Sequence, residues 1–217
     1  DEGMQVTLLS RLPRLISIIV AGMGIAISGL IMQSISRNKF VSPSTAATMD
    51  SAKLGVLVSL ILFSGSSPLN KMIISFIFAI GGTILFMQIL RKIKFQNAIF
   101  IPLVGIMLGN IINSITTFFA YRLNIIQSIS AWMQGDFSMI IKGRYELLYI
   151  SLPLLAVAFL YANKFTIAGM GEDFAANLGL NYNRVVNMGV GIVALISSLV
   201  IITVGTIPFL GLIVPNI

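Results

Sequence analysis

The chain contains no cysteine and no histidine among its 217 residues, and only 10% of its residues are charged. Without cysteine there is no disulfide and no thiol nucleophile, and without histidine there is no imidazole for acid–base chemistry or for a typical zinc site. A nucleophile and base pair at workable spacing is difficult to assemble from the remaining residue types. These absences argue against an enzyme.

Two sequence features through which transporters obtain energy are also missing. The loop Gly-x-x-x-x-Gly-Lys-Ser/Thr, which binds the phosphates of ATP, does not occur in the sequence. The apolar stretches carry no run of acids of the kind that couples transport to protons or sodium ions. A transporter with this sequence would therefore need energy from a partner.

Apolar residues dominate instead, at 57% of the chain, and the mean hydropathy is +0.98. This composition predicts an all-α integral membrane protein, because about 20 apolar residues are needed to cross the hydrocarbon of a bilayer. Six spans are predicted, at 12–34, 45–64, 70–90, 98–120, 146–162 and 184–205. A seventh span is expected to begin within 208–217, so we expect the chain to be incomplete at its C-terminus. Its first residue, Asp1, suggests a loss at the N-terminus too.

The net charge of +7 is interpreted as a record of membrane topology, because Lys and Arg concentrate on the cytoplasmic side. The number of Lys and Arg residues differs little between the two sides of the membrane. The closely spaced Arg91, Lys92 and Lys94 favour a cytoplasmic position for the loops 35–44, 91–97 and 163–184. These loops hold Arg37, Lys39, Arg91, Lys92, Lys94, Lys164 and Arg184, and the opposite side holds Arg11, Arg14, Lys71, Arg122, Lys142 and Arg144.

A polar interruption at 163–184 separates two long apolar spans and is predicted to hold a short helix. Glu172 and Asp173 suit its first turn, where acids face the positive end of the helix dipole, and Gly179 suits its end. Phe174 and Leu178 are spaced to share one face. We interpret this as a docking element for another protein. The alternative is a helix lying on lipid, although such helices usually carry Lys and Arg on their polar face.

Two groups of polar residues lie inside the predicted spans. Asp50 and Lys53 are spaced to neutralise one another on one helix face, and structural pairing is favoured over a role in translocation. The second group forms a stripe along the fourth span, which predicts either the lining of a path or hydrogen bonds between helices, with equal weight on physical grounds alone. The stripe consists of Asn110, Asn113, Ser114, Thr117 and Tyr121.

Small residues recur in two other spans. Ala21-Gly22-Met23-Gly24 and Ser28-Gly29 in the first span, and Gly81-Gly82 in the third, are expected to let helices approach closely.

Four motifs in order resemble the FecCD-type permeases of ABC importers for iron-siderophores, haem and vitamin B12, and the resemblance covers the whole chain. They are Arg11-Leu12-Pro13-Arg14 before an apolar helix; Ile27-Ser28-Gly29-Leu30-Ile31-Met32-Gln33 with Arg37-Asn38 and Pro43; Gly171-Glu172-Asp173 with Leu178-Gly179; and Gly205 to Pro215.

The resemblance implies the type II ABC importer permease fold, with ten spans, of which this chain would hold the second to the seventh and the lead-in to the eighth as one permease domain, 1–217. It implies a multi-pass protein of the bacterial cell membrane that works as a homodimer or with a sibling permease. Two cytoplasmic P-loop ATPase subunits, which bind ATP and Mg²⁺, would bind the segment 163–184, the cytoplasmic coupling loop. An extracytoplasmic binding protein would deliver the substrate. No cofactor or metal is implied for this chain itself.

The resemblance also assigns roles to residues. It implies coupling to the ATPase at Gly171, Glu172, Asp173, Phe174, Leu178 and Gly179. Arg11 and Arg14 would receive acidic residues of the binding protein, where charge steers association; their alternative is simple interfacial arginines. The resemblance tips the stripe through Asn110, Asn113, Ser114 and Thr117 toward lining the pathway.

Departures from the common family pattern narrow the choice of substrate. Asn38-Lys39 replaces a frequent Asn-Pro, Met49 to Gly55 replaces a run rich in Gly and Ala, and Pro215-Asn216 replaces a frequent Pro-His. These forms resemble the branch that imports ferric catecholate and petrobactin-type siderophores, so an iron-siderophore is favoured over vitamin B12 or haem. A secondary transporter that uses Asp50, and a membrane scaffold without transport, are the rival hypotheses.

Overall fold

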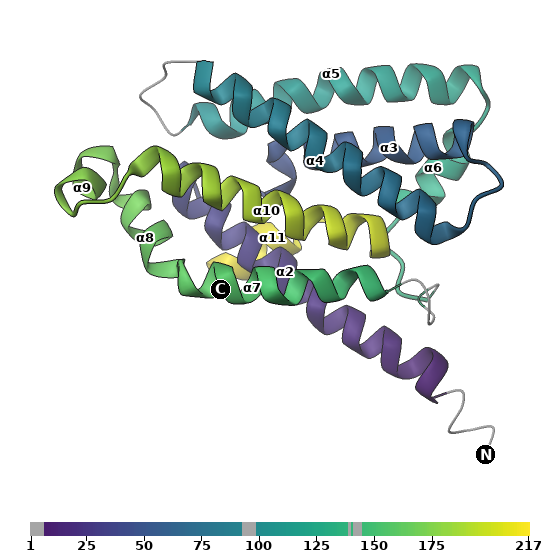
Figure 1. Cartoon of the computed structure of the whole chain (residues 1–217), viewed down its shortest axis with the longest axis horizontal. Coiled ribbons are helices and arrows are strands. Elements are labelled where there is room, and N and C mark those ends of the chain that lie inside the picture. Colours follow the sequence, from purple (N-terminus) through teal and green to yellow (C-terminus); the bar gives the residue numbers. More distant parts are fainter. Residues whose placement is uncertain (1–6, 93–98, 139, 141–144) are drawn as a thin grey trace.

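The computed structural model describes residues 7–92, 99–138, 140 and 145–217. Within these ranges every regular element is helical, apart from a single bridge between Gln134 and Thr206, so the predicted all-α bundle is confirmed (Figure 1). The elements are η1 (Thr7–Arg11), α2 (Leu12–Ser36), η2 (Pro43–Ala46), α3 (Thr48–Leu62), α4 (Pro68–Lys92), α5 (Phe100–Arg122), α6 (Ile126–Met133), η3 (Glu146–Ile150), α7 (Ser151–Leu160), α8 (Ala162–Met170), α9 (Glu172–Asn177), α10 (Tyr182–Val204), α11 (Leu210–Ile213) and η4 (Val214–Asn216).

Four helices among the described residues are long and apolar enough to cross a membrane. They are Thr7–Ser36, Pro68–Leu90, Phe100–Arg122 and Tyr182–Val204, and each overlaps a predicted span. A fifth crossing is made if the pair Glu146–Leu160 and Ala162–Met170, bent by 54°, counts as one span.

The predicted span at 45–64 is shorter in the structure than expected. Helix α3 has only 15 residues, which at 1.5 Å per residue gives a length of about 22 Å, less than the roughly 30 Å of bilayer hydrocarbon. The expected six spans are therefore corrected to four, or five with the bent pair. The apolar run was long enough, but its first part forms η2 and a turn at Ala47, whose φ is 57°.

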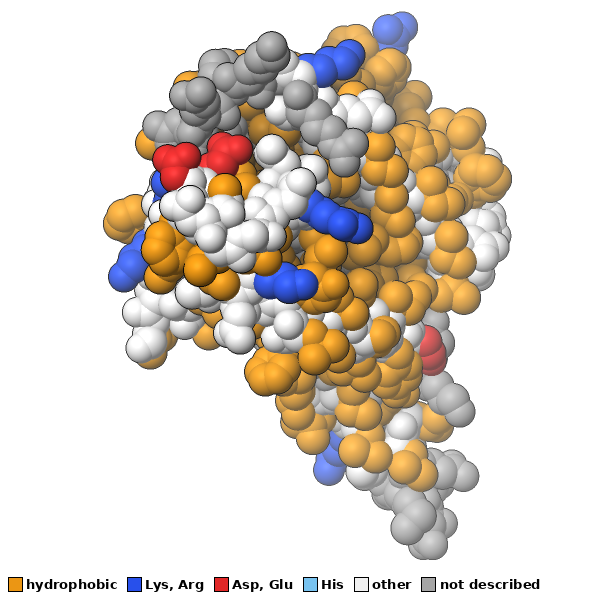
Figure 2. Space-filling model, turned by 60° about the vertical axis from the view of Figure 1, so that its left-hand side comes forward, with side chains coloured by type: hydrophobic (Ala, Val, Ile, Leu, Met, Phe, Trp, Pro, Cys, Tyr) orange, Lys and Arg blue, Asp and Glu red, His pale blue; other side chains and the backbone are white. Residues whose placement is uncertain are grey.

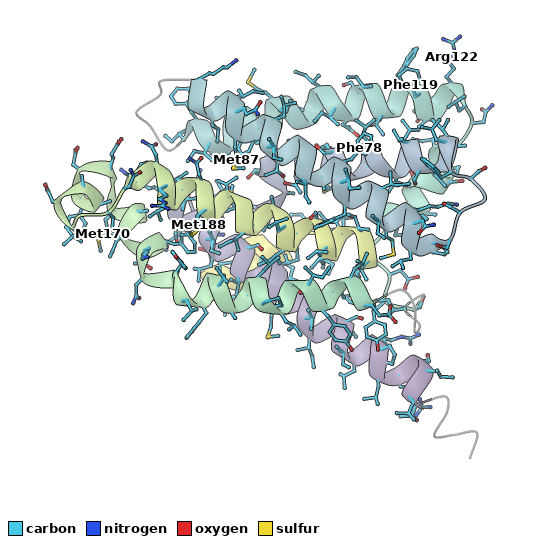
Figure 3. The ribbon with its side chains drawn as sticks, in the orientation of Figure 1. Phe78, Met87, Phe119, Arg122, Met170 and Met188 are labelled. Atoms are coloured by element: carbon cyan, nitrogen blue, oxygen red, sulfur yellow. The ribbon has the colours of Figure 1, made fainter. Side chains whose placement is uncertain are left out.

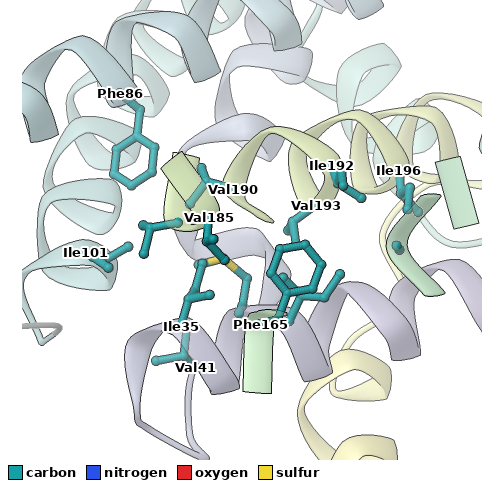
Figure 4. Close-up of a cluster of buried hydrophobic side chains, with 14 of the residues drawn as sticks. Ile35, Val41, Phe86, Ile101, Phe165, Val185, Val190, Ile192, Val193 and Ile196 are labelled. Atoms are coloured by element: carbon teal, nitrogen blue, oxygen red, sulfur yellow. The ribbon is translucent and has the colours of Figure 1, made fainter. Parts of the chain in front are cut away.

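Helix α10 lies at the centre of the bundle. Of its apolar window 78% is buried, against 22–50% in the other three long helices. Its Val190, Val193 and Ile196 pack with Phe86 of α4 and Phe165 of α8 in the main hydrophobic core (Figure 4). Because most of α10 is covered by other helices, it needs no polar face, and its hydropathy of 2.5 is the highest of the four.

Glycines bring the helices close together at several of the predicted positions. A Cβ on Gly24 would lie 2.9 Å from Ile196 Cγ2 of α10, a Cβ on Gly29 would clash with the backbone of Gly211, and a Cβ on Gly82 would clash with Ser51 of α3. The expected packing role is confirmed for these three. Gly22 and Gly81, in contrast, face open space.

The chain places two sets of loops at opposite ends of the bundle. Helix α9 lies at one end, together with the end of α4, and the start of α2 lies at the other (Figure 1). We call these the α9 end and the Arg14 end. Of the basic residues used to predict topology, Lys94, Lys142 and Arg144 lie outside the described residues, as does the side chain of Arg91.

Candidate functional site

The turn into α9 is built on Gly171, whose φ of 131° is a conformation that residues with a side chain rarely adopt. A Cβ on Gly171 would lie 2.9 Å from Nη2 of Arg37, so the missing side chain makes room for that guanidinium. Arg37 itself ends α2 in a left-handed conformation, with φ of 49°. Arg37 thus connects the end of α2 with the start of α9, a contact that the sequence motif did not predict.

The end of α9 confirms the predicted stop at Gly179. The N–H of Gly179 donates to the Ala176 carbonyl at 2.9 Å, and the N–H of Leu180 donates to the Ala175 carbonyl at 2.9 Å. With φ of 74° at Gly179, these bonds form a Schellman motif. Both ends of α9 are therefore fixed by backbone geometry.

The outer surface of α9 carries the residues predicted for docking. Glu172 and Asp173 are exposed in its first turn, while Ala175 is buried beneath them. Phe174 and Leu178 are 46% and 56% exposed, large values for apolar side chains. Acidic, basic and apolar side chains lie close together at this end (Figure 2). A hollow of about 690 Å³ is lined by Arg37, Met170, Gly171, Glu172, Asp173, Phe174 and Asn177, so Leu178 lies outside it.

The two arginines predicted to receive the binding protein, at the opposite end of the bundle, lie in different surroundings. Arg11 is exposed in η1, whereas Arg14 is half-buried and donates from Nη2 to the Ser138 carbonyl at 3.0 Å. Ser138 in turn donates to the Asp136 carboxylate from N–H and from hydroxyl, both at 2.7 Å. These hydrogen bonds, and secondarily the charge of Arg14, lower the pKa of the Asp136 carboxyl. Arg14 therefore holds a loop of its own chain, and Arg11 remains more accessible.

The polar stripe on α5 borders an open groove of about 770 Å³. Phe119 and Arg122 mark the end of this helix, far from Met170 at the α9 end (Figure 3). Asn110 is exposed and lies outside the groove, and its carbonyl accepts a hydrogen bond from Ser114 Oγ at 2.8 Å. The lining consists of Asn113, Ser114, Thr117, Phe118, Tyr121 and Arg122.

Lys53, the predicted partner of Asp50, has a hydrogen-bond partner on α5. Lys53 Nζ donates to Asn113 Oδ1 at 2.8 Å, while Lys53 still attracts the Asp50 carboxylate electrostatically. Asp50 Oδ2 lies where a Cβ on Gly109 would be. Asn113 thus makes the expected hydrogen bond between helices and also lines the groove, while its place on a transport path stays a prediction.

Another contact between distant segments closes the Arg14 end. The N–H and hydroxyl of Thr206 both donate to the Met133 carbonyl at 2.9 Å, and a Cβ on Gly205, whose φ is 90°, would clash with the backbone of Gln134. These contacts tie the segment after α10 to the end of α6. Within the described part of the chain, no group of three or more His, Cys, Asp or Glu side chains could hold a metal ion.

Comparison with known families finds a match over residues 2–217 to the FecCD transport family. The chain belongs to this family. The resemblance inferred from the four sequence motifs is thereby confirmed, and the protein is a multi-pass membrane protein.

Two FecCD relatives illustrate the similarity. The petrobactin import system permease protein YclN of Bacillus subtilis is 65% identical over 208 residues, which are 96% of this chain and 66% of that protein. The ferric-anguibactin transport system permease protein FatD of Vibrio anguillarum is 41% identical over the same shares of the two chains. The chain spans about two thirds of the length of these relatives.

A solved structure described as a metal-chelate type ABC transporter in an inward-facing conformation has the same fold. The TM-score is 0.87 at 20% sequence identity, covering 98% of this chain and 69% of that one. At this identity the similarity shows the fold alone.

Proposed function

We propose that this chain is the membrane-spanning permease subunit of an ABC importer in the bacterial cytoplasmic membrane. It carries an iron-siderophore complex from an extracytoplasmic binding protein to the cytoplasm, and a separate ATPase supplies the energy, so the chain itself is not an enzyme. The observation that carries this proposal is the 65% identity, over 96% of the chain, to a petrobactin import permease.

The geometry of α9 supports its assignment as the site of ATPase coupling. Its exposed Phe174 gives a partner an apolar anchor beside the charged Glu172 and Asp173. Backbone hydrogen bonds hold α9 to the segment that leads into α10, and the Arg37 contact holds it to α2. A movement imposed on α9 by ATP-driven closure would therefore reach the central helices directly, without passing through a flexible linker.

The Arg14 end suits the binding protein. We assign to Arg11 the attraction of acidic groups on its surface, and to Arg14 the support of the loop that forms the same surface, because Arg14 is bonded to Ser138. Exposed charges of this kind act mainly on the rate of association.

The substrate pathway is assigned to the groove on α5. Only 33% of the apolar window of this helix is buried, which leaves its surface available to a second permease, either another copy or a sibling chain. In this arrangement Asn113, Ser114 and Thr117 line one half of the path, with Asn110 near it. The iron is cargo held by its siderophore, and ATP and Mg²⁺ belong to the ATPase.

The proposal is tested by purifying the full-length protein from its native membrane in mild detergent and identifying its partners by mass spectrometry. We expect a P-loop ATPase in near-equal amount with wild type and its loss with Phe174→Asp and Leu178→Asp. Phe63→Asp is a matched control, because Phe63 is 48% exposed at the end of α3, at the Arg14 end of the bundle. Uptake of ferric siderophore without any ATPase would contradict the proposal.

The substrate is tested separately, by uptake in cells that lack their own copy of the gene. We expect the full-length protein to restore uptake of ferric petrobactin, and restoration of vitamin B12 or haem uptake instead would favour the alternative substrates. A secondary transporter would lose all uptake with Asp50→Asn. We expect that variant to retain part of its uptake and to weaken assembly, because Asp50 lies beside Lys53 and against Gly109.

A further inference from the structure

Three polar side chains meet between α3 and α5. Asp50 and Lys53 lie one turn apart on α3, and Asn113 lies one turn beyond Gly109 on α5. Asp50 occupies the space that the missing side chain of Gly109 leaves, and Lys53 reaches Asn113 Oδ1 at 2.8 Å. The face of α5 that contacts α3 is thus shaped to receive this charged pair.

The Lys53 contact determines which way the Asn113 amide points. An ammonium group has only hydrogen-bond donors, so it must face the carbonyl oxygen of the amide and never its nitrogen. The NH₂ group of Asn113 is therefore directed away from Lys53. It makes no hydrogen bond to any residue that the structure describes, although Asn113 lines the groove.

The other polar groups that line the groove are the hydroxyls of Ser114, Thr117 and Tyr121 and the guanidinium of Arg122. Ser114 uses its hydroxyl hydrogen on the Asn110 carbonyl, and Arg122 lies at the end of the helix. Among the described lining residues none is acidic. The Asn113 amide is also polarised by the Lys53 ammonium behind it, which strengthens its N–H groups as donors. Such a groove favours a ligand rich in oxygen acceptors and negative charge.

We propose that Asn113 is a binding residue for an anionic, oxygen-rich iron chelate, such as a catecholate or carboxylate siderophore, and that Lys53 and Asp50 position it. This inference rests on the proposed import of an iron chelate. Asn113 touches the chelate oxygens through its NH₂ group. Lys53 fixes the amide orientation from behind, and Asp50 offsets the charge of Lys53 and holds it against α5.

A purely structural role of Asp50 and Lys53 predicts a different experimental result. Asp50 and Lys53 could neutralise each other on α3 alone, and an ion pair of that kind needs no contact with a groove. Removing it would lower the amount of folded permease, with transport per assembled complex unchanged. The two interpretations therefore separate once uptake is divided by the amount of assembled transporter.

The experiment uses the full-length permease with its ATPase and binding protein, and initial uptake of ferric petrobactin labelled with radioactive iron. Asn113→Asp replaces the NH₂ donor by a negatively charged acceptor, and we expect uptake per complex to fall by about tenfold, as when a donor to a charged group is lost. Asn70→Asp is the control, because Asn70 is an exposed amide in the first turn of α4.

The positioning role is tested with Asp50→Asn/Lys53→Met, which removes both charges together and avoids an unpaired Asp50. We expect uptake per complex to fall about threefold through a higher half-saturating concentration, because the amide loses its fixed orientation. Lys53→Arg, which can still donate to Asn113, is expected to recover most of the uptake.

The outcomes distinguish this inference from the function on which it rests. Uptake within twofold of wild type for both Asn113→Asp and Asn113→Leu would overturn the inference and leave the importer proposal standing. A fall in the double variant that only follows the amount of assembled complex would overturn the positioning role. Absence of ferric siderophore uptake by wild type would overturn both the proposed function and this ligand.

Discussion

Helices α10 and α5 each have 23 residues and each is long enough to cross the membrane, but they differ in what surrounds them. The apolar window of α10 is 78% buried and has a hydropathy of 2.5, whereas that of α5 is 33% buried with a hydropathy of 1.6. Most of α10 packs against other helices, and α5 carries a polar stripe beside a groove. With the proposed pathway along the groove, we expect substitutions on α10 to act on folding and those on the groove face of α5 to act on transport.

The largest expected effect compares two phenylalanines. Phe165, 2% exposed, packs against α10 in the core, and Phe118, 58% exposed, lies on α5. Phe165→Ala should reduce the free energy of unfolding by about 3 kcal/mol, because the lost contacts leave a cavity. Phe118→Ala should reduce it by less than about 0.5 kcal/mol. Unfolding of the purified full-length protein in detergent measures both, and equal losses would contradict the comparison.

Two glycines test whether packing is equally tight all around α10. A Cβ on Gly189 would lie 3.1 Å from Phe165 Cε1 and 3.2 Å from Ile31 Cγ2, whereas one on Gly191 would meet nothing within 4 Å. Gly189→Val should therefore cost about 1–3 kcal/mol of stability through overpacking. Gly191→Val should change stability by no more than about 0.5 kcal/mol. The same unfolding measurement applies, and a large cost at Gly191 would show that the open side of α10 is covered in the assembled protein.

Adjacent threonines sharpen the comparison on α5. Thr116 is buried and donates to the Ile112 carbonyl at 2.8 Å, while Thr117 lines the groove. Thr116→Val should lower stability by at most about 1 kcal/mol and leave uptake per complex unchanged. Thr117→Val should leave stability unchanged and reduce uptake of ferric siderophore about threefold, through the loss of one neutral hydrogen bond. The reverse pattern would place the pathway elsewhere.

The sequence predicted the structural features that depend on residues close together in the chain. Composition determined the class of protein, apolar runs located the long helices, and the residue types in 171–179 predicted a short helix with acids at its start and glycine at its end. These features follow from hydrogen bonding and solvation within a few residues. The family motifs then added the fold, which the relatives and the solved structure confirm.

Contacts between distant segments could not be predicted in the same way. Lys53 and Asn113 are 60 residues apart, and the sequence offered Asp50 as the obvious partner. Arg37 meets Gly171 only because α2 and α8 end side by side. The shortness of α3 was missed because its apolar run extends into η2, and hydropathy does not register the turn at Ala47.

The smallest expected effect concerns the exposed turn where the end of α10 meets the segment after α6. The Asp136 N–H donates to the Val204 carbonyl at 3.0 Å, and its carboxylate accepts two hydrogen bonds from Ser138. The two bonds from Ser138 lower the pKa of Asp136, so its ionised form stabilises the folded state above the unfolded pKa of about 3.9, and this contribution is lost as pH falls through the lower folded pKa. Asp136→Asn should therefore lower the unfolding temperature slightly at pH 7. The difference from wild type should shrink as the pH falls below about 4. A difference that is constant with pH would mean that the negative charge of Asp136 does not contribute to the stability of this end of α10.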